Sequence, residues 1–436
     1  MTVMKTSDPC VTAIDLGSSH CTTVIAVPNP EGSDYRIVGF ASLPARGIKK
    51  GNIVDLDQAV QTIMTSLDRA EKMAGLQSRS AVMSVTGSHI TSQNLPGMIA
   101  ISNPNQEVTA EDVARVIDAA KAVALPAGRE IIFLAPRFFT LDSQEGIKDP
   151  LGMVGMQLRS EVHMITGGTA NIRNLEKCMK DLELGIDDFV FEGLAAAEVT
   201  LTDTERELGV VAINMGAGTT SFCAYVDGSI AYSGCLPIGA NHITQDIALA
   251  YKISFDSAEK IKLSLSEEDL LVDMQNKDES KEEYRRRLRL ADALDPALLG
   301  IPETIGSISK NYLIRTVMMA RVREIFELVV EQLESRKLKE QIPSGAVISG
   351  GGALTVGITD EATKILGLNA RVGAPNNVRG VAENLEDPRF ATVLGLLQYI
   401  THQQSSSLVS EAPPQIISSR GNLLNKISDF FRSFFP

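Results

Sequence analysis

Two segments of the chain carry the same pattern: a strand of buried type, a glycine turn and a second strand. Residues 11–15 lead into Gly17-Ser18-Ser19 and then into the apolar, β-branched run 21–27. About 200 residues further on, residues 209–215 lead into Gly216-Ala217-Gly218-Thr219-Thr220 and the run 221–226. A pattern that occurs twice predicts a duplicated architecture with two lobes. The length of 436 residues agrees, because a single hydrophobic core rarely grows that large.

The remaining patterns divide the chain between these lobes. We predict a lobe 1 core at residues 11–85 and 166–204, a lobe 2 core at 205–237 and 317–401, and a smaller lobe 2 subdomain at 238–316. Residues 86–165 form a small inserted α/β subdomain, in which Thr109 and Asp112 have the spacing of a capping box. A last core helix is expected at 389–400, before a flexible linker at 402–420. No role is assigned to residues 264–309, whose charged run 281–287 predicts an exposed helix or loop.

Composition limits the classes of function. The net charge of −13 excludes nucleic acid as an expected partner, because phosphate binding needs a basic face. The same charge repels an anionic membrane, so membrane contact must come from a local segment. The five cysteines form no C-x-x-C pair, which favours a reduced cytosolic protein, and the five scattered histidines argue against a zinc site. We find no secretory signal and no apolar stretch near the roughly 18 residues of a spanning helix.

Each glycine turn has the chemistry of a phosphate site. Glycine lets the backbone approach a ligand, and the amides and hydroxyls of a turn can point at phosphate oxygens. Asp15, just before the first turn, can hold Mg²⁺ through water, because Mg²⁺ keeps most of its hydration shell. A third turn, Gly350-Gly351-Gly352-Ala353, offers bare backbone to an adenine or a ribose. Any one such turn is more often an ordinary hairpin or loop, but three together favour a nucleotide.

Five stretches resemble the FtsA family of bacterial cell-division proteins, which belongs to the superfamily of actin, DnaK chaperones and sugar kinases. They are residues 13–19, 46–55, 87–90, 144–150 and 239–244. The second and fourth are specific to the division family. The resemblance runs from about residue 11 to about residue 400. It implies an actin-like, two-lobed α/β fold with duplicated mixed-sheet lobes and an extra subdomain at 86–165.

The resemblance also implies ATP and Mg²⁺ between the lobes. The implied contacts are Asp15, Gly17, Ser18, Ser19, His20, Gly216, Ala217, Gly218, Thr219, Thr220, Gly239, Glu259, Lys262, Gly350, Gly351, Gly352 and Ala353. For Glu259 and Lys262 the alternative is an exposed helix face. The superfamily has carboxylates where this chain has Asn214 and Ser221, and Ala217 adds a methyl where the backbone should approach phosphate. We therefore expect bound nucleotide with slow or absent hydrolysis, and no catalytic residue is assigned.

The last sixteen residues, 421–436, form an amphipathic helix when they are placed at about 100° per residue. The apolar stripe is about 140° wide and consists of Leu423, Leu424, Ile427, Phe430, Phe431, Phe434 and Phe435. Arg420, Lys426 and Arg432 against Asp429 make the segment locally basic. This pattern is typical of a helix that lies in a lipid interface. The alternative is a helix on the protein's own core, which a long polar linker disfavours.

These features favour a membrane-tethering scaffold that carries nucleotide. The resemblance implies self-assembly, recruitment of downstream membrane division proteins and attachment of the tubulin-like polymer FtsZ to the cytoplasmic face of the inner membrane. The FtsZ tail would dock near Arg321 and Glu324, although the Glu-Pro that usually precedes this arginine is Met-Ala here. An ordinary i, i+3 ion pair is the alternative for these two residues. The alternative functions are an ATP-hydrolysing enzyme of the superfamily and a pilus-assembly adaptor with the same fold.

Overall fold

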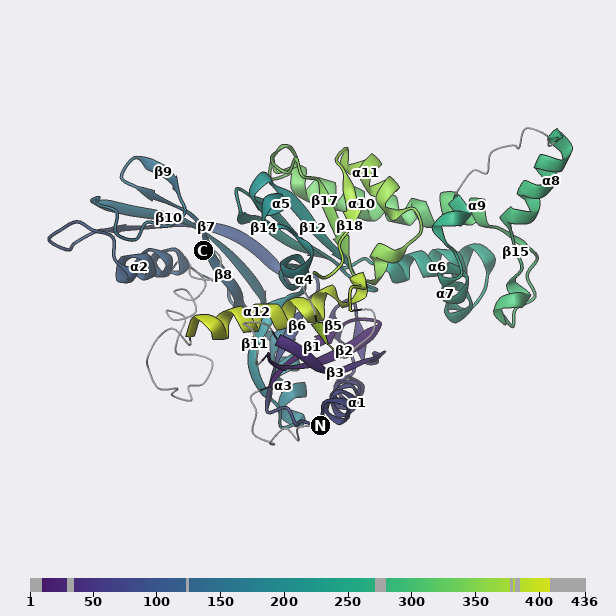
Figure 1. The fold of residues 1–436 in the computed structure, drawn as a ribbon, viewed down its shortest axis with the longest axis horizontal. Coiled ribbons are helices and arrows are strands. Elements are labelled where there is room, and N and C mark those ends of the chain that lie inside the picture. Colours follow the sequence, from purple (N-terminus) through teal and green to yellow (C-terminus); the bar gives the residue numbers. More distant parts are fainter. Residues whose placement is uncertain are drawn as a thin grey trace.

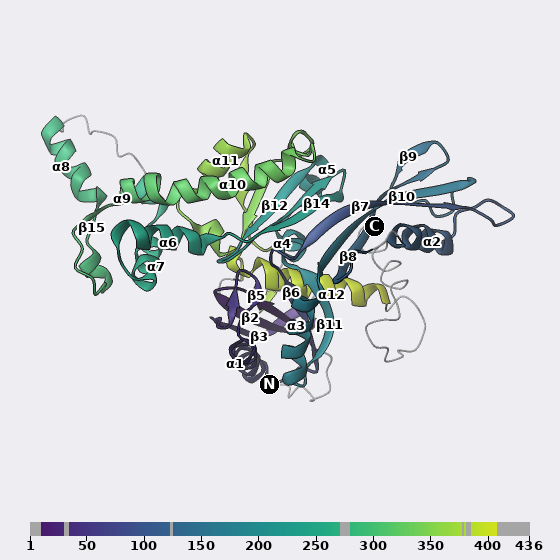
Figure 2. The ribbon, with the colours of Figure 1, turned by 180° about the vertical axis from the view of Figure 1, so that it is seen from behind.

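The computed structural model describes residues 10–29, 35–122, 125–270, 280–376, 379–380 and 385–407. Figures 1 and 2 show the chain from two opposite sides. The predicted membrane helix at 421–436 lies outside the described residues, as does the linker from residue 408 onward. Within the described residues, no helix has both the length and the apolar character needed to cross a bilayer.

Lobe 1 is built on a six-stranded sheet in the order β11-β6-β1-β2-β3-β19. The strands are β1 (Val11–Leu16), β2 (His20–Pro28), β3 (Tyr35–Pro44), β6 (Ser80–Val85), β11 (Gly185–Phe191) and β19 (Arg379–Gly380). Helices α1 (Leu56–Ala74) and α3 (Thr169–Asp181) cover one face, where they pack on Ile14 and Met83. Asp55 caps the start of α1, and Gly75 ends it at a φ of 67°.

Lobe 2 repeats this arrangement, which confirms the predicted duplication. Its sheet has the order β14-β13-β12-β17-β18, with β12 and β13 antiparallel and β12 and β17 parallel, as β1, β2 and β6 are in lobe 1. The strands are β12 (Val210–Met215), β13 (Thr220–Val226), β14 (Ser229–Leu236), β17 (Ala346–Ser349) and β18 (Ala370–Val372). Helices α10 (Met319–Glu334) and α11 (Ile358–Leu366) pack against each other and share a core with this sheet.

Two helices lie between the lobes: α4 (Glu192–Thr200) and α12 (Ala391–Ser407), with the short α5 (Asp203–Leu208) following α4. Their buried residues join one hydrophobic cluster with residues of both sheets. They cross at Gly395, where a Cβ would lie 1.7 Å from the carbonyl oxygen of Ala195. The predicted end of the last helix at residue 400 is wrong, since α12 runs through the first residues of the predicted linker to Ser407.

The inserted subdomain is a four-stranded sheet in the order β7-β10-β8-β9 with one helix, α2 (Ala110–Lys121). Its strands are β7 (Thr91–Ala100), β8 (Arg129–Leu141), β9 (Gln144–Ile147) and β10 (Gln157–Gly168). The predicted capping box of Thr109 and Asp112 is confirmed. Polar bonds link this subdomain to lobe 2: Ser92 Oγ donates to the carbonyl oxygen of Ser233 at 2.6 Å. The side chain of His163 lies 3.0 Å from Ser233 Oγ.

The small subdomain of lobe 2 forms the opposite end of the molecule in Figure 1. It contains α6 (Ala240–Tyr251), α7 (Phe255–Leu263), α8 (Lys281–Asp292), the two-residue strands β15 (Ala293–Leu294) and β16 (Ile308–Ser309), and α9 (Lys310–Tyr312). A π-helical turn, Leu313–Met318, joins α9 to α10. The charged run 281–287 is therefore helical, one of the two alternatives open from the sequence.

Candidate functional site

The two predicted phosphate turns have the same backbone geometry. In the β1–β2 turn the amide of Gly17 donates to the carbonyl oxygen of His20 at 2.9 Å. In the β12–β13 turn the amide of Gly216 donates to the carbonyl oxygen of Thr219 at 2.9 Å. Ser19 Oγ lies 3.0 Å from His20 Nδ1. Each turn therefore closes with one bond and leaves its tip free of strand pairing.

The tips of the two turns meet between the lobes. A Cβ on Gly218 would lie 2.6 Å from Ser18 Oγ, so this contact requires glycine. The start of α6 packs on the β12–β13 turn, where a Cβ on Gly239 would lie 2.5 Å from the carbonyl oxygen of Gly216. The backbone amide of Asn241 donates to the carbonyl oxygen of Ala217 at 2.9 Å. The fold thus brings together five predicted contact positions from two distant parts of the sequence.

A short hairpin that had no role in the sequence prediction borders the same site. It consists of β4 (Ile48–Lys49) and β5 (Asn52–Ile53). The amide of Gly51 donates to Ser18 Oγ at 3.1 Å, and the Cα of Lys50 would lie 3.1 Å from a Cβ on Gly218. This hairpin lies within the stretch 46–55, one of the two most family-specific stretches. Gly47 and Gly51 have φ of 79° and 74°, and these two glycines were the sequence signal from which the hairpin could have been predicted.

Two carboxylates lie beneath the turns. Asp15 accepts a hydrogen bond from Ser84 Oγ at 2.7 Å. Glu192 is 7% exposed at the first position of α4 and accepts a hydrogen bond from Asn214 Nδ2. Burial raises the pKa of both groups, and the charge of Asp15 raises the pKa of Glu192 further. The sequence prediction missed Glu192, although a polar residue directly after a buried strand was a usable signal.

This geometry changes the interpretation of Asn214 and Ser221. Asn214 donates to Glu192 and also to Thr392 Oγ1 at 3.1 Å, and it accepts from Ser349 Oγ at 3.2 Å. Ser221 Oγ lies 3.1 Å from Thr86 Oγ1. Asn214 and Ser221 supply no carboxylate, as expected, and Glu192 brings one to Asn214 from another element; slow or absent hydrolysis stays a prediction.

The third glycine turn lies at the end of β17, beside β12 and the segment that precedes α12. Gly350 has a φ of 80°, and its amide donates to the carbonyl oxygen of Pro388 at 2.9 Å. A Cβ on Gly352 would lie 2.4 Å from Met215, so this part of the turn packs against β12. Gly351 is exposed, with Arg389 as its nearest side chain, and the buried Ala353 donates its amide to Gly350 at 3.1 Å. The turn therefore offers open backbone at Gly351.

Glu259 and Lys262 of α7 form an ion pair of 2.7 Å, and each also contacts Thr244 Oγ1, at 2.5 Å and 2.8 Å. They are therefore more ordered than an exposed helix face. The pKa of His20 is lowered by burial and by the charge of Arg389, while Glu259 opposes this shift. Three charged or titratable groups therefore interact around the turns: His20 from lobe 1, Glu259 from the small subdomain and Arg389 from the segment before α12.

Comparisons with known proteins agree with this architecture. A family model described as the SHS2 domain inserted in FtsA matches residues 87–166, and a model described as cell division protein FtsA matches residues 211–395. A cell division protein FtsA from Borreliella burgdorferi is 34% identical over 98% of both chains. Another from Pseudomonas aeruginosa is 32% identical over 92% of both chains. The chain belongs to the FtsA family of cell division proteins.

Solved structures show the actin-like fold of this family member. The PilM–PilN type IV pilus biogenesis complex matches with a TM-score of 0.58 at 16% identity, over 89% of this chain and 98% of the other. MreB5 of Spiroplasma citri bound to AMPPNP matches with a TM-score of 0.50 at 14% identity, over 92% and 98%. At such low identity these matches concern the fold alone, and the family assignment rests on the sequence relatives.

The residues expected to bind the partner lie on α10. Arg321 is held by Asp246 of α6, with Nε–Oδ2 of 2.7 Å and Nη2–Oδ1 of 2.9 Å, and it also pairs with Glu324. Glu324 is exposed. The predicted membrane residues, from Leu423 to Phe435, lie outside the described residues.

Proposed function

We propose that this member of the FtsA family is an ATP-binding, self-assembling scaffold that anchors FtsZ to the cytoplasmic face of the inner membrane and recruits further division proteins. The observation that carries the nucleotide part is the contact between the two glycine turns, over Asp15 and Glu192. A ligand held there touches both lobes, so its presence can change how the lobes fit together. In the resulting scheme the nucleotide acts as a switch for assembly.

The residues fit a magnesium nucleotide. Backbone amides of the turns at Gly17–His20 and Gly216–Thr220 are the donors for phosphate, and Asp15 holds Mg²⁺ through water. The Gly350–Ala353 turn carries the base, with Glu259 and Lys262 at the ribose. MreB5 structures contain AMPPNP or ADP, which supports a nucleotide in this fold. Saturable binding of a fluorescent ATP analogue tests the proposal, and absence of binding would refute it.

Turnover is proposed to be slow rather than absent. Glu192 is the buried carboxylate next to the phosphate turns and is suited to orient or deprotonate an attacking water. Its raised pKa leaves it partly protonated near neutral pH, which limits its use as a base. Phosphate release should therefore be slow in the wild type and fall at least tenfold in Glu192→Gln, while nucleotide affinity is kept. Fast wild-type turnover would contradict a switch-like role.

Membrane attachment is proposed for the amphipathic helix at 421–436. A short helix of this kind binds weakly, so self-assembly adds affinity through many linked copies. Co-sedimentation with vesicles of phosphatidylethanolamine and phosphatidylglycerol should pellet the full chain but not a chain ending at Ser407, which keeps α12 whole. A second control, Phe431→Asp with Phe434→Asp, retains the length of the tail. Equal pelleting of all three proteins would refute the assignment.

The FtsZ tail is proposed to bind at the start of α10. Because Arg321 also holds Asp246, its removal disturbs α6, whereas Glu324 is exposed and its surface ion pair with Arg321 adds little to stability. We expect Glu324→Arg to weaken binding of the FtsZ C-terminal peptide at least tenfold while the melting temperature stays unchanged. Wild-type failure to bind the peptide would exclude FtsZ as the partner.

A further inference from the structure

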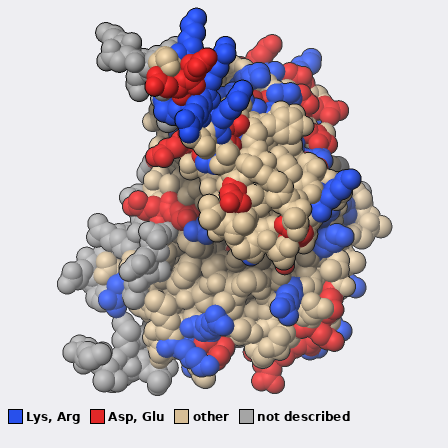
Figure 3. All heavy atoms as spheres, turned by 90° about the vertical axis from the view of Figure 1, so that its right-hand side faces the viewer, with Lys and Arg blue, Asp and Glu red and all other residues tan. Residues whose placement is uncertain are grey.

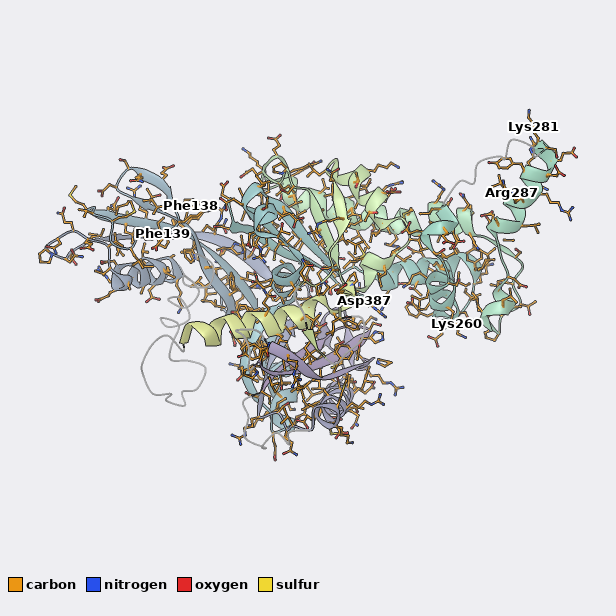
Figure 4. The ribbon with its side chains drawn as sticks, in the orientation of Figure 1. Phe138, Phe139, Lys260, Lys281, Arg287 and Asp387 are labelled. Atoms are coloured by element: carbon orange, nitrogen blue, oxygen red, sulfur yellow. The ribbon has the colours of Figure 1, made fainter. Side chains whose placement is uncertain are left out.

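Helix α8 has no part in the proposed nucleotide site, and its last residue, Asp292, ties it to the subdomain by accepting hydrogen bonds from Ser309 and Asn311. None of its twelve residues is buried, and it projects from the end of the small subdomain (Figure 1). Figure 4 labels Lys281 at the outer end of this helix and Arg287 further along it, where the guanidinium lies over the Tyr284 ring. A helix of this length is marginal by itself in water. Its persistence as an exposed helix suggests a partner surface.

The exposed side of α8 is basic on a chain whose net charge is −13. Lys281, Arg285 and Arg289 recur every fourth residue and therefore form one row, about 12 Å long. All three are exposed, and none takes part in the ion pairs found among the described residues. Figure 3, which looks onto this end, shows Lys and Arg gathered over its upper part.

A groove of complementary charge lies on lobe 2 of the same chain. It has a volume of about 550 Å³ between α10 and α11, and its lining includes Val330, Ile365 and the cation Lys364, which pairs with Glu361 at 3.8 Å. Glu327, Glu331 and Glu334 line it at spacings of four and three, a row about 10.5 Å long. Glu327 and Glu331 are exposed and form no ion pair within the described residues, while Glu334 pairs with Lys339.

We propose that α8 of one chain docks in the α10–α11 groove of a second copy. The two rows match in length and are opposite in charge, and the aliphatic stems of the arginines can pack on Val330 and Ile365. Figures 1 and 2 both show α8 at the end of the long axis, away from α11, so a chain does not fill its own groove. The contact joins two different surfaces and so generates open, head-to-tail assembly.

This inference rests on the self-assembly in the proposed function and names its contact. Charge reversal gives a sharp test, because the two surfaces can be changed separately. In one full-length variant Arg285→Glu is combined with Arg289→Glu, and in the other Glu327→Arg is combined with Glu331→Arg. Each variant alone should raise the critical concentration for assembly with MgATP about tenfold or more, as measured by pelleting. An equimolar mixture should assemble again, because alternating copies then meet only opposite charges.

A matched control for the α8 variant is Arg173→Glu with Lys177→Glu on α3, an exposed pair with the same spacing and the same change in net charge as that variant. It should assemble as the wild type does. Assembly of either single-surface variant at the wild-type concentration would overturn the contact, and so would a mixture that fails to recover. If the α8 variant loses vesicle binding under dilute conditions and the groove variant does not, α8 binds lipid headgroups instead. A wild type that never assembles would refute self-assembly itself, which is a separate outcome.

Discussion

At the scale of single residues, Asn214 decides the electrostatics of the site. It lies at the end of β12 and donates to Glu192, so an uncharged amide faces a buried carboxylate that itself borders the turn at Gly216. The superfamily pattern has a carboxylate at this position. Placing one here would set two acids in contact, and only a shared proton would relieve their repulsion.

We therefore expect Asn214→Asp to destabilise the protein by about 1–3 kcal/mol near pH 8. A carboxyl pair with a raised pKa in the folded state stabilises it below the unfolded pKa and loses that contribution as pH rises. The loss of stability of Asn214→Asp relative to the wild type should therefore become smaller as the pH falls toward 5. Chemical unfolding of Asn214→Asp and of the uncharged control Asn214→Ala at both pH values measures this. A deficit of the same size at both pH values in Asn214→Asp would contradict the assignment.

His163 is a second residue whose position dictates a measurable behaviour. It is 1% exposed between Asn94 and Ser233, where it connects the inserted subdomain to lobe 2. Burial and the charge of Arg137 lower its pKa to about 3. The folded chain keeps this ring neutral, while the unfolded chain protonates it near its ordinary value of 6.5.

Stability should therefore fall as pH drops below about 6.5, by about 1.4 kcal/mol per pH unit from this residue alone. The variant His163→Gln keeps polar groups in the same place and should remove that slope between pH 6.5 and 5.5. The measurement is the midpoint of urea unfolding at closely spaced pH values. Parallel curves for both proteins would show that His163 is protonated in the folded state.

At the scale of elements, the crossing of α4 and α12 holds the lobes together. Gly395 allows the two backbones to touch at Ala195, and buried residues of both helices pack on both sheets. No side chain fits at Gly395 unless the helices separate.

Gly395→Ala should consequently lower the free energy of unfolding by at least about 1–3 kcal/mol, as overpacking of a core does. It should also weaken nucleotide binding, because α4 begins beside the turn at Gly216 and would move with it. Gly306→Ala is the control, since a Cβ there meets nothing within 4 Å. Thermal unfolding compares them, and equal melting temperatures would mean that the helices can move apart freely.

At the scale of the whole molecule, the turn contact between Ser18 and Gly218 is where the lobes meet at the proposed nucleotide site. A ligand bound there stabilises the folded chain by about 2.7 kcal/mol at a concentration of 100 times Kd. The wild type should therefore melt at a higher temperature with MgATP. In Gly218→Ala the added methyl presses on Ser18 and on Lys50, so this shift should be largely lost. An unchanged shift in the variant would place the nucleotide elsewhere.

Much of this architecture could be predicted from the sequence. The paired strand–turn–strand pattern predicted two similar lobes, because continuous apolar runs and glycine turns are local signals. The capping box of Thr109 and Asp112 was predictable for the same reason. The glycines of the three turns were also local signals, and a phosphate at their backbone stays a prediction.

Other features depended on contacts between distant segments. Glu192 reaches Asn214 only because β11 delivers it to the start of α4, 22 residues before its partner in sequence and in a different lobe. The end of α12 at Ser407 also escaped prediction, since the Ser- and Gln-rich composition there favours a linker. Sequence by itself determined the two lobes and the glycine turns, because their signals are local. Only the tertiary structure decided which charges face one another, because chain folding joins residues whose spacing in sequence carries no sign of contact.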